Sequence, residues 1–171
     1  MKKIFIIFYL IFSCSVFCQE KLSSNEIYFQ NNLAHKISDN NLFSGTVEDF
    51  KKSHISYSAE YLDGFLTNES FYYNFQKKLN KDIRYKKIYY SNNLKVKEET
   101  FLSTAEKNST TEFDENGKKK IYEFLKDGKV VFSQNFLNGK LNGKLFNIDK
   151  KGDSCISYYS NGKMISTNFK K

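Results

Sequence analysis

The chain has 171 residues with 17 Phe and 12 Tyr, and this aromatic content excludes a disordered chain because the rings can bury enough surface to offset chain entropy. The formal net charge of +8 comes almost entirely from lysine, since Arg84 is the sole arginine. Bidentate recognition of guanine and phosphate favours arginine, so the composition argues against a nucleic-acid partner. The length favours one domain, and the absence of proline suits long paired strands.

Residues 1–18 have the layout of a secretory signal peptide. Lys2 and Lys3 form a positive start, and the apolar run Ile4–Phe12 follows and continues weakly to Cys18. The run is short for a membrane-spanning helix, which needs about 20 apolar residues. We therefore expect an N-terminal signal helix, cleavage after Cys18, and export to the periplasm or the cell exterior. An uncleaved N-terminal anchor is the alternative.

The cysteines add another alternative for this segment. The residues up to Cys14 loosely resemble a lipobox, which would make the chain an outer-membrane lipoprotein, but Phe12 is bulky where a small residue is usual. Cleavage after Cys18 leaves Cys155 as the lone cysteine, which cannot form an intramolecular disulfide. The strand-like run around Cys155 favours a small half-buried residue over a nucleophile.

Residues 19–41 form a lead-in segment. Two runs, Glu26–Gln30 and Leu33–Ile37, flank the pair Asn31-Asn32, and this pattern predicts a first hairpin. The apolar spacing from Leu22 to Ile37 also fits a helix. We favour the hairpin.

From residue 42 onward, glycines divide the chain into short apolar runs. Six of the eight glycines follow Asn or Asp, and such pairs tolerate the positive φ of tight hairpin turns. Alternating runs such as Ile55, Tyr57 and Ala59 predict strands with one buried face. The expected fold is all-β, an elongated antiparallel meander of β-hairpins. The predicted structural turns lie at Gly45, Gly64, Gly117, Gly128, Gly139, Gly143, Gly152 and Gly162.

The hairpin unit resembles a known repeat. A Leu-Asn-Gly-like entry, an aromatic strand and a turn such as Tyr158–Lys163 are similar to the bacterial variant of the MORN (membrane occupation and recognition nexus) repeat. Leu42–Val47 resembles an opening unit common in exported members. The resemblance covers residues 42–171; it is clearer over 112–168 and degenerate over 65–111, where Asn68, Lys81 and Asn93 replace the usual glycine.

This resemblance implies stacked hairpins that contact a membrane or another protein. Some bacterial relatives carry antitoxin-like labels, which makes an antitoxin or immunity-type partner protein one alternative function.

The polar stretch Ser103–Thr111 interrupts the repeat, and we expect a loop or bulge there.

The chain contains none of the common catalytic or cofactor motifs. It has no phosphate-binding loop, no GxGxxG, no GxSxG, no HExxH and no CxxC. The two histidines, His35 and His54, are too far apart for short metal-ligand spacing. We therefore expect no catalytic residue, no cofactor and no metal.

Binding is the function that these features favour. Tyr72, Tyr89 and Tyr159 are expected opposite the apolar face, where they can contact a partner or a glycan. The run Lys118-Lys119-Lys120 follows a turn and can contribute to a basic ridge, as can Lys86-Lys87 if it lies near a strand end. We expect an exported, non-catalytic binding or scaffold protein of the cell envelope or exterior. Its partner is expected to be a protein, a glycan or an anionic membrane surface, the last through peripheral contact.

Overall fold

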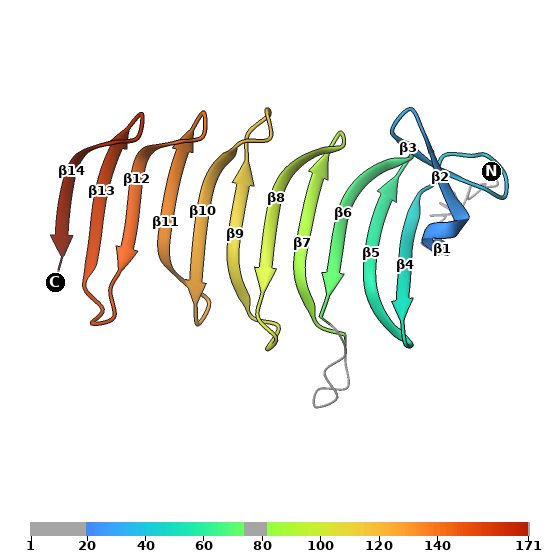
Figure 1. The fold of residues 1–171 in the computed structure, drawn as a ribbon, viewed down its shortest axis with the longest axis horizontal. Helices are drawn as coiled ribbons and strands as arrows, with labels where there is room; N and C mark the ends of the chain where they lie inside the picture. The colour runs from blue at the N-terminus through green and yellow to red at the C-terminus, as the bar shows by residue number, and fades with distance from the viewer. Residues whose placement is uncertain (1–19, 74–81, 171) are drawn as a thin grey trace, which may run out of the picture.

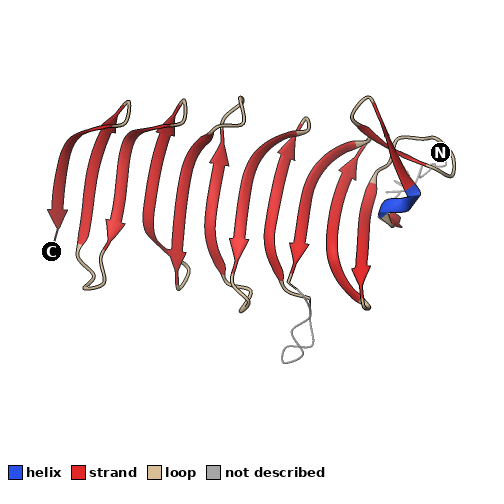
Figure 2. Ribbon diagram, in the orientation of Figure 1, coloured by secondary structure: helices blue, strands red, loops and turns tan. Residues whose placement is uncertain are grey.

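The computed structural model describes residues 20–73 and 82–170, and most of them belong to one large sheet (Figures 1 and 2). Its twelve strands lie side by side, and β4 to β14 follow chain order as an antiparallel meander. The first and last strands lie at opposite ends of the molecule, so the sheet is open (Figure 1). The expected all-β hairpin meander is confirmed. The expected signal helix, Cys14 and Cys18 lie outside the described residues.

The elements begin and end as follows. A three-residue strand and a short 3-10 helix come first: β1 (Glu20–Leu22) and η1 (Ser24–Glu26). A separate two-stranded sheet comes next: β2 (Ile27–Gln30) and β3 (Leu33–Lys36). The meander then contains β4 (Gly45–Lys51), β5 (His54–Leu62), β6 (Phe65–Tyr72), β7 (Arg84–Ser91), β8 (Leu94–Phe101), β9 (Lys107–Phe113), β10 (Lys119–Lys126), β11 (Lys129–Leu137), β12 (Lys140–Ile148), β13 (Ser154–Ser160) and β14 (Lys163–Lys170).

Six hairpins of the meander share one turn design. Each has two positive-φ residues at its tip, and in each the pairing register shifts after the first two residue pairs. Such bulges bend a strand and increase its twist. In two hairpins the hydroxyl of the bulged residue donates to a carbonyl across the pair, Ser56 to Asp49 at 3.0 Å and Thr67 to Glu60 at 2.9 Å. The tips are Lys52-Ser53, Asp63-Gly64, Asn92-Asn93, Asp127-Gly128, Asn138-Gly139 and Asn161-Gly162.

Two of the glycines predicted to form turns lie inside strands instead. Gly45 opens β4 beside β1, where an added Cβ would lie 2.3 Å from the carbonyl oxygen of Glu20. Gly143 lies in β12 with φ +88°, at a bulge where residues 142–144 oppose Asn135 of β11. The positive φ that Asn-Gly tolerates suits a bulge as well as a turn, which is why the prediction at Gly143 was wrong. The turn predicted at Gly45 was wrong, because glycine is required there by the close approach of the Glu20 carbonyl oxygen and not by a turn.

Two further expectations were partly wrong. The loop or bulge expected over Ser103–Thr111 is present as a loop before β9 and a register shift between Thr100 and Phe101. The rest of this stretch is strand, because β9 already begins at Lys107 and pairs with β8. The Lys86-Lys87 pair lies inside β7 rather than near a strand end, and the cross-strand partner of Lys86 is Thr100.

The hydrophobic core lies at the N-terminal end of the sheet. The predicted first hairpin is confirmed as β2–β3, and it is fixed by backbone hydrogen bonds from Ala34 N to Gly64 O and from Phe43 N to Ala34 O, both 2.9 Å. Along residues 114–170, by contrast, only Ser157 is buried. The expected apolar buried face is therefore concentrated where the hairpin covers the sheet, and it does not extend into residues 114–170. The buried core residues are Ile27, Ala34, Phe43, Val47, Ala59 and Tyr61.

Candidate binding surface

The strand register divides the side chains of the meander between two faces. Residues that pair across strands share a face. One face, which we call the Tyr89 face, carries the cross-strand rows Asn68, Tyr89, Lys97 and Ser70, Lys87, Glu99. The other, the Glu69 face, carries the row Val47, Ala59, Glu69, Ile88, Glu98. The β2–β3 hairpin packs on Val47 and Ala59, so the only described layer over the sheet lies on the Glu69 face.

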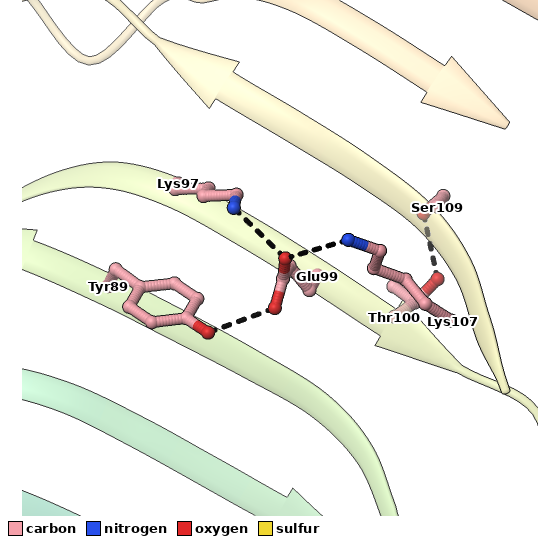
Figure 3. A network of polar contacts seen from close by, with 6 residues as sticks. All are labelled: Tyr89, Lys97, Glu99, Thr100, Lys107 and Ser109. Carbon is pink, nitrogen blue, oxygen red and sulfur yellow. Dashed lines mark hydrogen bonds and ion pairs between the residues drawn. The ribbon is translucent and has the colours of Figure 1, made fainter. Parts of the chain in front are cut away.

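Glu99 is the centre of a polar network on the Tyr89 face (Figure 3). One carboxylate oxygen accepts the Tyr89 hydroxyl at 2.9 Å. The other lies 3.0 Å from Lys97 Nζ and 3.4 Å from Lys107 Nζ. These groups come from β7, β8 and β9, and we call them, with Lys87, the Tyr89 cluster. Because both oxygens are occupied, Glu99 ties three neighbouring strands together.

The environment fixes the protonation state of this network. Glu99 is only 7% exposed, and burial acts to raise its pKa, but the hydrogen bonds from Lys97 and Tyr89 and the two lysine charges outweigh burial and lower the pKa. Burial and the hydrogen bond to Glu99 raise the pKa of Tyr89. Near neutral pH, Glu99 is therefore charged and Tyr89 is a neutral donor. The hydrogen bond between them fixes the positions of both side chains on this face.

Cations surround the rings of this face. Lys87 Nζ lies 4.8 Å and Lys97 Nζ 5.5 Å from the ring centroid of Tyr89. Arg84 belongs to the same strand as Tyr89, β7, and its guanidinium lies 5.9 Å from the ring centroid of Tyr72 on the neighbouring strand β6. Cation–π contact helps to hold such side chains in place on this face. The result is a patch of ordered aromatic and cationic groups, of which the tyrosines and Arg84 are residue types enriched in binding interfaces.

A second carboxylate–tyrosine network lies on the Glu69 face. Glu69 accepts the Tyr57 hydroxyl at 2.8 Å and the Tyr90 hydroxyl at 2.5 Å. Burial, assisted by Glu69, raises the pKa of Tyr57 and of Tyr90, and burial raises that of Tyr61 to about 12. These tyrosines are also neutral donors. This network lies beside the N-terminal core and contributes to packing there.

The predicted binding residues do not form one surface. Tyr72 shares the Tyr89 face, because its hydroxyl lies 3.3 Å from that of Ser58, which pairs with Ser70. Tyr159 lies on the Glu69 face near the C-terminal end. Lys118 lies in the exposed β9–β10 turn, and Lys119 and Lys120 begin β10 and are exposed. The register connects Tyr159 to the Glu69 face through Ser157, Leu145, Gln134, Tyr122, Thr111, Glu98, Ile88 and Glu69.

Sequence reasoning missed Glu99, Lys97 and Lys107. Lys97 and Glu99 are two residues apart in a strand and thus on one face, which was a usable signal. The approach of Lys107 and the Tyr89 hydroxyl depends on the register between strands, which a single sequence does not encode locally.

The histidines lie apart from the Tyr89 cluster. His35 stacks on Tyr28 with ring centroids 5.2 Å apart, and His54 Nδ1 lies 3.5 Å from Asp82. Beside His54 is an open pocket of about 510 Å³. The nearby Ser56 hydroxyl donates to a backbone carbonyl, so these three side chains do not form a nucleophile–base chain. The pocket is lined by Lys51, Lys52, His54, Ile55, Ser56, Tyr72 and Tyr73.

The described part of the chain has neither a cluster of metal-ligating side chains nor a membrane-spanning helix. Residues 20–73 and 82–170 contain no group of three or more His, Cys, Asp or Glu side chains placed to hold a metal ion. Within the same residues, no helix has the length and apolar character needed to cross a membrane.

Comparison with known proteins gives limited similarity. No protein-family model and no curated protein matches the chain. Among solved structures, the chain is similar to part of a GtfA/B complex bound to UDP and GlcNAc, with a TM-score of 0.40 and 13% identity over 71% of this chain and 23% of that chain. A second GtfA/B complex gives a TM-score of 0.39 and 15% identity over 63% of this chain and 20% of that one. The chain thus spans less than a quarter of either matched chain.

Proposed function

We propose that the chain is an exported, non-catalytic β-repeat protein that binds a protein or glycan partner through the Tyr89 face. The observation that supports this most is the Tyr89 cluster itself. Its side chains are held by hydrogen bonds and cation–π contacts on a face that no described layer covers. Because these side chains are already ordered, a ligand that binds them loses less conformational entropy.

The repeat also supports a scaffold role. Six hairpins with the same turn, each with a register shift after two residue pairs, form an extended, regularly spaced surface. The MORN resemblance of residues 42–171 and the signal-like residues 1–18 belong to this proposal, and they are the reason for proposing a location in the cell envelope or outside the cell. The lowered pKa of Glu99 and the raised pKa of Tyr89 keep Glu99 charged and Tyr89 protonated near neutral pH. A group that keeps one protonation state near neutral pH suits binding better than proton transfer.

The test compares variants on the two faces. The chain from residue 19 is immobilised and exposed to the envelope fraction of its own source cell. We expect Tyr72→Ala with Tyr89→Ala to lose the molecules that the unchanged protein retains, because the aromatic contacts of the Tyr89 face are removed.

Tyr159→Ala is the matched control, since it removes a half-buried tyrosine from the opposite face. It should retain the same molecules, and far-UV circular dichroism should show that all variants are folded. An identical bound set for both tyrosine variants and the unchanged protein would contradict the proposal.

A further inference from the structure

The last strand of the sheet has a free edge. Among the described strands β14 pairs only with β13, and all eight of its residues are exposed. Figure 1 shows it at the C-terminal end of the row of strands. An edge strand directs alternate backbone N–H and C=O groups outward, where another extended chain can pair with them.

The side chains of β14 leave this edge unprotected. Met164, Ile165 and Phe169 are 60%, 68% and 80% exposed, and the strand carries charge only at its two ends, at Lys163 and Lys170. Natural edges are usually protected by central charges, proline or short length. The opposite end of the sheet follows that rule, since β1 has only three residues and Lys21 forms an ion pair with Glu48 at 2.9 Å.

Charge distinguishes the two ends of the molecule as well. Residues 114–170 carry eleven Lys against six Asp and Glu, a net charge of +5. Residues 20–73 and 82–113 carry ten Lys and Arg against thirteen Asp and Glu, a net charge of −3. Near β14, the Asp149 carboxylate accepts hydrogen bonds from the backbone of its own turn. A segment that pairs with β14 therefore meets a basic surface.

In the register that pairs all eight residues of β14, this charge pattern disfavours a second copy of the chain. Antiparallel pairing of two β14 strands about a two-fold axis between Ser166 and Thr167 would place Lys163 opposite Lys170 of the second copy, twice. Like charges directly opposite each other destabilise a strand pair. The two basic halves would also be brought together.

We propose that β14 is the docking edge for an extended, acidic segment of a partner protein, which adds a strand to the sheet. Acidic residues at the ends of that segment pair with Lys163 and Lys170. Its apolar residues contact Met164 and Phe169, which share one face because their partners Tyr159 and Cys155 are four residues apart in β13. The inference rests on the proposed binding role but concerns a different surface.

Blocked peptides test this directly. The probe has glutamate at both ends and Val, Phe and Val alternating with Thr between them. One control has lysine at both ends, and another has the glutamates but an N-methylated backbone. Binding to the folded chain is followed by fluorescence anisotropy at low and high salt. We expect the acidic peptide to bind best and to weaken as salt screens the lysines.

Charge reversal at the edge provides the decisive comparison. Lys163→Glu with Lys170→Glu should weaken binding of the acidic peptide about tenfold or more and improve binding of the lysine peptide, because two attractive pairs become repulsive. Lys118→Glu with Lys119→Glu makes the same change of charge at a distant turn and should alter neither affinity by more than about twofold.

Several results would overturn the assignment to an acidic segment. Equal affinity of the N-methylated peptide, or unchanged binding by Met164→Ser with Phe169→Ser, would exclude strand addition at β14. A dimer in light scattering that is lost in the latter variant would identify a second copy instead. Binding to phosphatidylglycerol vesicles without peptide binding would identify a membrane. If only the peptides fail while the Tyr89-face comparison succeeds, the proposed function stands without this inference.

Discussion

A buried carboxylate in a one-layer sheet requires partners close by, and Glu99 has three. Removing its charge leaves Lys97 and Lys107 with no carboxylate at 3.0 and 3.4 Å, although an amide oxygen can still accept the Tyr89 hydroxyl. We expect Glu99→Gln to lower the free energy of unfolding at pH 7 by about 1.5–3 kcal/mol, the usual range for hydrogen bonds to a charged group. Urea unfolding measures this, with the exposed turn variant Glu115→Gln as the control.

The stabilisation by Glu99 should depend on pH. The pKa of Glu99 is lowered in the folded state from its ordinary value of 4.5, so its contribution to stability is complete above that value and is lost as the pH falls through the folded pKa. The stability difference between the protein and Glu99→Gln should therefore shrink below about pH 4.5. A difference that stays constant down to pH 3 would show that the charge is not what stabilises the network.

At the scale of elements, the contact of β1 with β4 depends on one glycine. A Cβ on Gly45 would lie 2.3 Å from the Glu20 carbonyl oxygen and 2.8 Å from the Phe43 ring, so β1 or the buried ring must move. We expect Gly45→Ala to destabilise the protein by about 1–3 kcal/mol, as overpacked sites do. The measurement is urea unfolding combined with limited proteolysis near residue 20.

Gly128→Ala is the matched control, because its Cβ would meet nothing within 4 Å and its cost comes from positive φ alone. We expect about 1 kcal/mol there and no new cleavage near the N-terminus. Equal cleavage in both variants would contradict the role of close packing at Gly45.

Single-sequence reasoning recovered the turns better than the faces. Asp63-Gly64 and Asn161-Gly162 were readable because few residue pairs tolerate two positive φ angles. Lys52-Ser53 was not readable, because neither residue type signals such a turn. Tyr159 was predicted on the same face as Tyr72 and Tyr89, but it lies on the Glu69 face. Each bulge in the strand pairs between them changes which residues of a strand point to a given face, and these bulges cannot be counted from the sequence. The Glu99 network could not be predicted as a whole, since it joins three strands through their register.

On the scale of the whole molecule, packing is unevenly distributed. The β2–β3 hairpin covers the N-terminal strands, whereas residues 114–170 bury only Ser157. We expect backbone amides of β5 to exchange with deuterium much more slowly than those of β13, because regions with few buried contacts open at lower free energy. Hydrogen-exchange mass spectrometry measures this peptide by peptide. Uniform protection from β4 to β14 would show that the sheet opens as one unit.

The bulge that recurs after two pairs in six hairpins also restricts how such a chain can lengthen. Duplication of one complete hairpin also duplicates its register shift. The side chains of all later strands therefore stay on the same face of the sheet as before. Insertion of a single residue within a strand instead sends all subsequent side chains of that strand to the opposite side. Growth of this architecture is therefore tolerated in whole modules and penalised in single steps.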